Sequence, residues 1–224
     1  MPNRTRWNPR PLRARRPTAP ERSGYRCDLI VIGVAGGIAS GKSTAARVFE
    51  RLGARVLDAD AIGHDLLRTE PMRDDVRSAF GEDVLTAEGD VDRRALGRVV
   101  FGDEQARQRL NRLVRPAIRA EIRRRIAEMR GEGYDGVVVV DAPLLVDTGP
   151  TDLADRVILV TAPASTRKER ILLRGLTGSE AEARIAAQEP DTKQARWADF
   201  ILENNGTQDE LIEQAEALWK RIVS

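Results

Sequence analysis

The stretch LIVIGVAGGIASGKST, residues 29–44, decides how this chain folds. Its first six residues are apolar and rich in β-branched side chains, which is typical of a strand buried on both faces of a parallel sheet. Residues 36–43 then match the pattern G-x-x-x-x-G-K-[ST], whose glycines let backbone N–H groups surround phosphate oxygens. Apolar side chains at helical spacing follow, with Gly53 where a helix would end. This order of strand, glycine-rich loop and helix predicts a nucleoside triphosphate site.

The residues of the loop suit a bound triphosphate and its metal ion. Backbone N–H groups and the positive end of a helix starting near Lys42 face the phosphates. Lys42 can reach the β- and γ-phosphates, and the Ser43 hydroxyl can bind Mg²⁺. The alternative is a glycine-rich turn with a solvated lysine. We therefore expect Mg²⁺ and ATP here, with these residues at the nucleotide: Gly37, Ala39, Ser40, Gly41, Lys42, Ser43 and Thr44.

Acids end two further predicted strands. Asp58 and Asp60 close the strand at residues 55–57, at the end where open α/β sheets bind ligands. One could hold a magnesium-bound water while the other accepts a proton from an attacking hydroxyl, and both point the same way only if the chain stays extended. The alternative is a pair of solvated loop or N-cap aspartates. Asp141, after residues 137–140, has the form of a Walker B acid that contacts Mg²⁺ through water, or else it caps a loop.

Strand-like and helix-like segments alternate along the chain, which favours a parallel sheet flanked by helices. The fold class is α/β: a P-loop NTPase with a five-stranded parallel sheet, an inserted helical domain and a helical lid. Helix starts are predicted at Asp92 and Asp103, and capping boxes at Ser179/Glu182 and Thr207/Glu210. The predicted strands are residues 29–34, 55–57, 137–140, 157–160 and 200–202.

Basic residues cluster in the helical pair after the fourth strand. A cluster of charges is usually a solvated face, but a lid over a transferring phosphate needs at least one arginine, whose planar fork binds phosphate bidentately. The cluster consists of Arg167, Lys168, Arg170, Arg174 and Arg184. His64, the one histidine, is interpreted as a packing or surface residue.

Composition excludes several classes of protein. Lys and Arg total 37 and Asp and Glu 35, a net charge of +2. Residues 1–27 hold eight arginines and one acid, a charge of +7, so the rest carries −5 and no broad nucleic-acid-binding face is expected. We interpret residues 1–27 as a solvated basic extension.

The single cysteine, Cys27, excludes an internal disulfide framework and fits a reducing compartment. Residues 29–39 fall short of the roughly 20 that a membrane span needs, so we expect no membrane partner. We also expect a cytoplasmic monomer without nucleic-acid partners.

Seven strings in the chain together resemble the dephospho-coenzyme A kinase family. They follow the family's order and span nearly everything from Leu29 to the C-terminus. The strings are GVAGGIASGKST (33–44), LDADAIGHDLL (57–67), RRALGRVVF (93–101), LNRLVRPAI (110–118), DAPLLVDTG (141–149), ARIAAQ (183–188) and ADFILENNG (198–206).

The resemblance implies transfer of the ATP γ-phosphate to the ribose 3′-hydroxyl of dephospho-coenzyme A. It implies Asp60 as the base, Arg174 as the lid arginine facing the phosphates, and Asn204 near the nucleotide base. It also implies a nucleotide-binding core (28–61, 132–163 and 191–224), a helical coenzyme A-binding insertion (62–131) and a lid (164–190).

Four positions depart from the family pattern. Ala39 replaces the usual third glycine, which is tolerable if its φ is negative. Arg115 and Pro116 stand for a frequent His-Pro pair, Asp147 for a longer glutamate, and Gly175 for the acid that often follows Arg174. We expect an active enzyme with an altered rim.

Other functions remain as alternatives. A P-loop kinase acting on a sugar, shikimate-like or nucleoside hydroxyl would keep the loop and the Asp58/Asp60 pair. A GTPase needs a guanine-binding N-K-x-D motif, which the sequence lacks. A nucleic-acid-binding module would depend on the arginines of residues 1–27.

Overall fold

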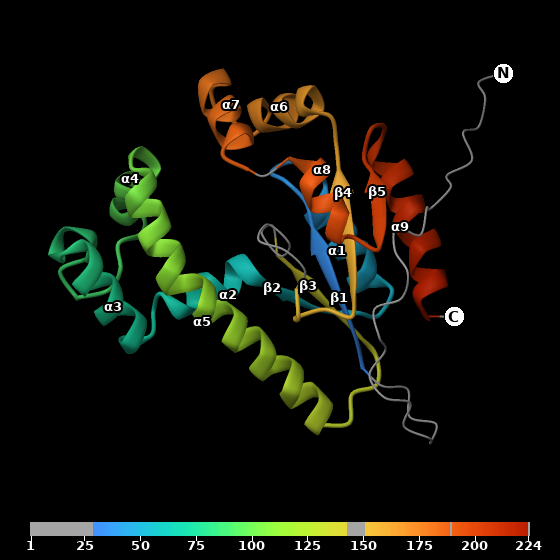
Figure 1. Cartoon of the computed structure of the whole chain (residues 1–224), viewed down its shortest axis with the longest axis horizontal. Coiled ribbons are helices and arrows are strands. Elements are labelled where there is room, and N and C mark those ends of the chain that lie inside the picture. The colour runs from blue at the N-terminus through green and yellow to red at the C-terminus, as the bar shows by residue number, and fades with distance from the viewer. Residues whose placement is uncertain (1–28, 143–150, 189, 224) are drawn as a thin grey trace. The chain divides into compact units, whose positions relative to one another are not determined.

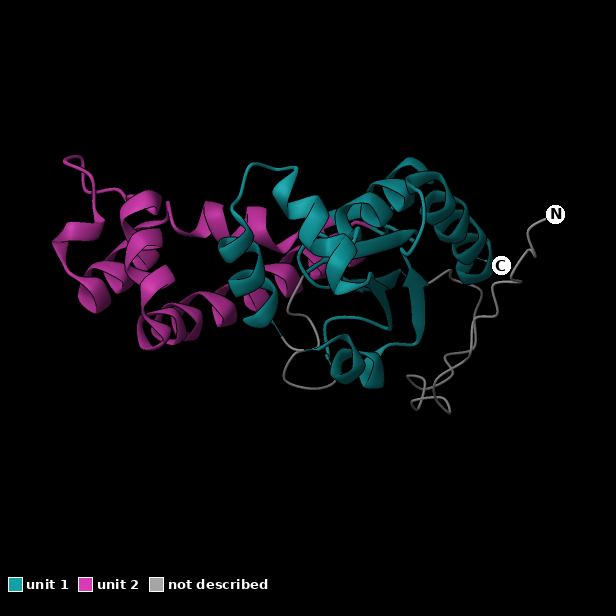
Figure 2. Ribbon diagram, turned by 90° about the horizontal axis from the view of Figure 1, so that it is seen from above, with its two compact units in different colours: residues 1–56, 133–224 teal, residues 57–132 magenta. Residues whose placement is uncertain are grey.

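The computed structural model describes residues 29–142, 151–188 and 190–223. The expectations for residues 1–27 and for Asp147 lie outside this part of the chain. The described chain divides into two compact units, residues 1–56 with 133–224 and residues 57–132 (Figure 2). The core, insertion and lid expected above are functional assignments, and they stay predictions.

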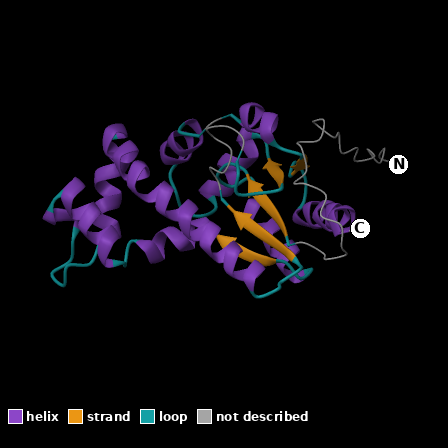
Figure 3. Cartoon of the chain, turned by 60° about the horizontal axis from the view of Figure 1, so that its bottom comes forward, coloured by secondary structure: helices purple, strands orange, loops and turns teal. Residues whose placement is uncertain are grey.

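A five-stranded sheet forms the centre of the first unit, as predicted, with strand order β2-β3-β1-β4-β5 (Figures 1 and 3). β1 pairs in parallel with β3 on one side and with β4 on the other, and β4 pairs in parallel with β5. Parallel pairing brings the carboxyl ends of these strands to one edge. The strands are β1 (Ile30–Ala35), β2 (Arg55–Asp58), β3 (Val137–Asp141), β4 (Arg156–Thr161) and β5 (Phe200–Glu203).

α1 and α9 pack on this sheet through an apolar core, whereas Ile171 of α6 and Ala181 of α7 form a separate cluster with Ala39. α1 and α9 lie against each other, with the rings of Phe49 and Trp219 stacked 6.0 Å apart between centroids. The core strands are buried on both faces, as their β-branched sequences predict. The helices are α1 (Lys42–Arg51), α6 (Ala164–Leu172), α7 (Gly178–Ala186), α8 (Asp191–Gln194) and α9 (Gln208–Val223), with the 3₁₀ turn η2 (Ala195–Trp197).

The second unit is helical and has its own small core around Met72, Val76, Val84 and Leu96. The long helix α5 contacts α2, α3 and α4. Ile122 and Ile126, four residues apart on α5, are buried. The elements are α2 (Ala59–Leu66), α3 (Glu70–Phe80), η1 (Glu82–Val84), α4 (Arg93–Gly102) and α5 (Glu104–Gly131).

The N-termini of four helices can be compared with the caps predicted from the sequence. Asp92 and Asp103 cap α4 and α5 as predicted, and Thr207 and Glu210 exchange the two expected hydrogen bonds. The capping box predicted at Ser179 is wrong. Thr177 caps α7, with Glu180 as its partner, so the N-cap lies two residues before Ser179 and the helix begins at Gly178. Both spacings satisfy the capping rule, so sequence alone did not separate them.

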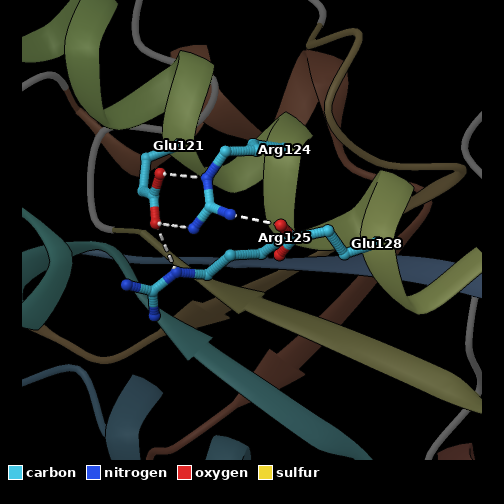
Figure 4. A network of polar contacts seen from close by, with 4 residues as sticks. All are labelled: Glu121, Arg124, Arg125 and Glu128. Atoms are coloured by element: carbon cyan, nitrogen blue, oxygen red, sulfur yellow. Dashed lines mark hydrogen bonds and ion pairs between the residues drawn. The ribbon is translucent and has the colours of Figure 1, made fainter. Parts of the chain in front are cut away.

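An ion-pair network lies on α5 (Figure 4). Glu121 accepts from Nε and Nη2 of Arg124, at 2.7 Å each, and from Nε of Arg125 at 2.7 Å. Arg124 also bonds to Glu128. The Arg124 hydrogen bond, helped by Arg125, lowers the pKa of Glu121 to about 2.

We expect Glu121→Gln to reduce the free energy of unfolding at pH 7 by a few tenths to about 1 kcal/mol, the range for solvent-accessible helical pairs. A lowered pKa stabilises the fold fully above the unfolded-state value near 4.5, and the contribution is lost as pH falls toward 2. Urea unfolding at pH 7, 4 and 3 should show a shrinking difference between variant and parent. Glu88→Gln, an exposed acid in the turn before α4, is the control. A difference as large at pH 3 as at pH 7 would contradict the ion-pair origin.

Candidate active site

The glycine-rich loop connects β1 to α1 at the carboxyl edge of the sheet, as predicted. Gly36 and Gly41 have positive φ values of 148° and 104°. A Cβ on Gly41 would lie 2.2 Å from Nδ2 of Asn204, and one on Gly36 would lie 2.5 Å from the Val160 carbonyl oxygen. The two motif glycines are therefore required by both conformation and close packing.

Ala39 is the only non-glycine residue with positive φ in the described chain, at 59°. The expectation that alanine is tolerable here required a negative φ, and the observed φ is positive. The left-handed conformation costs an alanine about 1–2 kcal/mol. Ala39 is buried in an apolar cluster with Ile171 of α6 and Ala181 of α7, and this packing offsets part of the cost.

We expect Ala39→Gly to change the free energy of unfolding by less than about 0.5 kcal/mol. Relief of the left-handed strain opposes the loss of the methyl contacts and the greater freedom of glycine in the unfolded chain. The matched control is Ala46→Gly, a buried position in α1, where roughly 1 kcal/mol or more should be lost. Urea unfolding measures both variants, and equal losses would contradict the strain at Ala39.

Lys42 begins α1, and its ammonium group bonds to Oδ1 of Asp141. The two side chains are 12% and 7% exposed. Asp141 ends β3, and in the parallel register it lies beside Val34 of β1, just before the loop. The sequence placed Asp141 at this edge but did not predict the pair, since the adjacency of β1 and β3 is not visible in the sequence.

Three polar side chains hold the carbonyl groups of the loop. Arg167 Nε donates to the Ile38 carbonyl at 3.0 Å, and Arg170 Nη1 donates to the Ala39 carbonyl at 3.2 Å. Asn204 Nδ2 donates to the Ser40 carbonyl at 2.7 Å. With its carbonyls held outward, the loop can present N–H groups to an anion.

The roles of three residues in this arrangement were not predicted from the sequence. Arg167 and Arg170 appeared only as members of a basic cluster, and Gln188, whose Oε1 accepts from the Ile38 N–H at 2.8 Å, was part of a family string without a role. Asn204 is buried and also accepts from Arg170 at 3.0 Å. Its predicted place near the nucleotide base stays a prediction.

The Ser40 hydroxyl is a polar atom that favours a ligand. The residue is fully buried, and its Oγ has no hydrogen-bond partner within the residues that the structure describes. Buried hydroxyl groups are nearly always paired, so an unpaired one inside this loop suits a phosphate oxygen as acceptor.

The second unit contains the predicted acids Asp58 and Asp60. Asp58 is the N-cap of α2, and its Oδ1 accepts from the N–H groups of Asp60 at 2.8 Å and Ala61 at 3.1 Å. The chain turns into the helix at Ala59, so the extended geometry that would point both acids the same way is absent. Asp60 is exposed in the first turn of α2, and His64 contacts Arg93 at 2.6 Å.

The other residues of the basic cluster make no hydrogen bond to the loop within the described residues. Arg174 is exposed in the turn after α6, before Gly175, whose φ is 85°. Arg184 is exposed on α7, and Lys168 forms an ion pair with Glu182. Arg115, at the position of the frequent histidine, is partly buried, and its Nε lacks a hydrogen-bond partner within the described chain.

The donor set at the loop suits Mg²⁺ bound together with a nucleotide. No group of three or more His, Cys, Asp or Glu side chains forms a metal cluster in the described part of the chain. Mg²⁺ in phosphate-transfer sites needs only one or two protein ligands, because phosphates and water supply the others. Ser43 is exposed in the first turn of α1, where it supplies a hydroxyl group. Asp141 supplies a carboxylate at the same edge of the sheet.

Comparison with known proteins identifies the family. The family model described as dephospho-CoA kinase matches residues 30–210. The chain belongs to the dephospho-CoA kinase family. A dephospho-CoA kinase from Geobacter sulfurreducens is 43% identical over 194 residues, which cover 85% of this chain and 98% of that protein.

Two solved structures are similar to this chain. The structure titled TT1252 from Thermus thermophilus is 33% identical with a TM-score of 0.70, covering 87% of this chain and 98% of that one. A dephospho-CoA kinase from Campylobacter jejuni is 26% identical with a TM-score of 0.59, covering 86% and 96%. The family is that of a kinase and therefore a phosphotransferase, as predicted, and the alternative of another small-molecule kinase is not favoured.

Within the described residues, no helix has the length and apolar character needed to span a membrane.

Proposed function

We propose that this chain transfers the γ-phosphate of ATP to the ribose 3′-hydroxyl of dephospho-CoA, using Lys42, Asp60 and Arg174. The observation that carries this proposal is the loop of residues 36–43, with its carbonyls bonded outward and Lys42 beside Asp141, in a member of this family.

Lys42 and the loop bind the phosphates of ATP. The ammonium group stands at the start of α1, where the helix end also favours negative charge. Asp141 orients this ammonium group from the end of β3. Ser43, with Asp141 through water, would hold Mg²⁺, which when bound neutralises charge on the β- and γ-phosphate oxygens.

Asp60 is the proposed general base for the 3′-hydroxyl. The Asp58 carboxylate already accepts two backbone N–H bonds as the cap of α2, which commits it to the helix start. The Asp60 carboxylate is exposed on the first turn, where it can accept a proton from an alcohol. These observations support assigning the base to Asp60 and the structural role to Asp58.

Arg174 is the proposed contact to the transferring phosphate. Its exposed position leaves the guanidinium able to meet an anion. Arg174→Lys is expected to lower kcat about tenfold or more, because a lysine lacks the bidentate fork. Arg184→Lys on α7 is the control, and a wild-type kcat for Arg174→Lys would contradict the role.

We also propose that the protein works as a cytoplasmic monomer without nucleic-acid partners. The low cysteine content and the acidic balance outside residues 1–27 support this. Deleting residues 1–27 is expected to leave turnover unchanged.

An acceptor comparison tests the function. ADP production is measured with Mg·ATP and either dephospho-CoA, gluconate, shikimate, adenosine or no acceptor. We expect turnover with dephospho-CoA alone, and coenzyme A as the product. Turnover with another alcohol and none with dephospho-CoA would overturn the proposal.

A further inference from the structure

Arg167 is a buried cation on α6 that donates directly to the loop. Its side chain is 7% exposed. Nε donates to the Ile38 carbonyl at 3.0 Å, Nη2 to Gln188 Oε1 at 2.7 Å, and Nη1 to Asp191 Oδ1 at 3.4 Å. Burying a guanidinium is costly unless its donors are satisfied, and here all three nitrogens have oxygen acceptors.

Gln188 completes the arrangement, because its Oε1 binds two partners at once. It accepts from Arg167 and also from the backbone N–H of Ile38, at 2.8 Å. The Ile38 residue is therefore held at both its N–H and its carbonyl group by side chains from outside the loop.

These contacts determine which N–H group of the loop is available. A trans peptide unit points its carbonyl and N–H in opposite directions, so the bond from Arg167 to the Ile38 carbonyl directs the Ala39 N–H away from α6. The Ile38 N–H is used by Gln188, and the Ser40 N–H donates to the Gly37 carbonyl at 3.1 Å. Of the N–H groups of residues 38–40, the one at Ala39 alone has no acceptor in the described chain.

Gly37 allows Arg167 to come this close. A Cβ at position 37 would lie 2.5 Å from Arg167 Nη2 and 2.8 Å from Gln188 Oε1. The glycine at this position therefore serves the contact with Arg167, whereas Gly36 and Gly41 serve the backbone turn.

We infer that Arg167 is a positioning residue that, with Gln188, holds the Ile38–Ala39 peptide so that the Ala39 N–H binds a phosphate of the nucleotide. The inference rests on the proposed function of the loop and adds a residue to it. It predicts that Arg167 affects nucleotides with a β-phosphate and has no direct effect on the acceptor substrate.

The experiment measures dissociation constants of Mg·ADP and of dephospho-CoA by calorimetry for the full chain. Arg167→Ala is expected to weaken ADP binding about tenfold or more, the scale of a lost charged hydrogen bond, and to change dephospho-CoA binding less than twofold. Arg167→Lys should recover part of the loss, because an ammonium group can meet one acceptor at a time. Lys168→Ala, which removes the neighbouring cation of α6 and its pair with Glu182, should bind ADP normally.

Hydrogen exchange provides a readout other than binding. The Ile38 amide should exchange at least about tenfold faster in Arg167→Ala and in Gln188→Ala, because both variants weaken its hydrogen bond. If Arg167→Ala does not fold, Gln188→Ala decides the question through ADP binding and exchange.

Two results would overturn the inference. One is ADP binding at wild-type strength in folded Arg167→Ala or, if that variant does not fold, in Gln188→Ala. The other is an equal loss for ADP and dephospho-CoA, which would indicate a merely structural role. A protein that binds ADP as described but does not phosphorylate dephospho-CoA would refute the proposed acceptor and leave the role of Arg167 intact.

Discussion

Lys42→Ala should lower kcat/KM by roughly 30- to 1,000-fold, or about 2–4 kcal/mol of barrier, the range for losing one electrostatic contact to a transition state. The ammonium group stands at the start of α1, and the substitution also deprives the buried Asp141 of this cation. Steady-state kinetics with varied Mg·ATP measures the loss, which should fall mainly on kcat if the charge acts on the transferring group.

A second lysine controls for the general effect of removing a positive charge. Lys220 lies in the last turn of α9, and its replacement in Lys220→Ala should leave kcat/KM unchanged. Full activity of Lys42→Ala would place the ammonium group away from the reacting phosphate and contradict the phosphate-binding role of the loop.

Asp60→Asn should lower kcat by 10²-fold or more while ATP binding is retained, because general-base assistance typically contributes about 10²–10⁴-fold. The amide is nearly the same shape and cannot accept the proton of the 3′-hydroxyl. Asp60 is exposed and does not cap α2, so the helix start is expected to survive.

Two variants separate the base from its neighbours on α2. Asp65→Asn, an exposed acid of the same helix, should keep wild-type kcat. Asp58→Asn keeps a capping residue and should affect stability more than chemistry, within about 1 kcal/mol. Near-normal kcat for Asp60→Asn would restrict Asp60 to binding the acceptor.

Local patterns in the sequence predicted the elements well. All five strands were predicted from short apolar runs, and the caps at Asp92 and Asp103 were predicted from residue type. These features depend on neighbouring residues, so the sequence contains the whole cause. The misplaced capping box at Ser179 shows the limit, because Thr177 and Ser179 compete within one turn.

Contacts between distant residues could not be predicted in this way. The Lys42–Asp141 pair joins residues 99 positions apart, and the Ile38–Gln188 bond joins residues 150 positions apart. Both depend on which strands and helices become neighbours, which the order of elements along the chain does not specify.

By itself, the sequence determined the α/β class, the phosphate-binding loop and the residue types available to it, because backbone preferences and burial act over a few residues. Only the tertiary structure decided that Ala39 adopts positive φ and that Asp58 caps α2 while Asp60 stays exposed. It also decided that Arg167 is buried against the loop. The positive φ of Ala39 and the burial of Arg167 depend on the packing of segments remote in the chain, where burial requires every polar group to find a partner. The Asp58 cap is a local contact, and the structure selected it from the alternatives that the sequence left open.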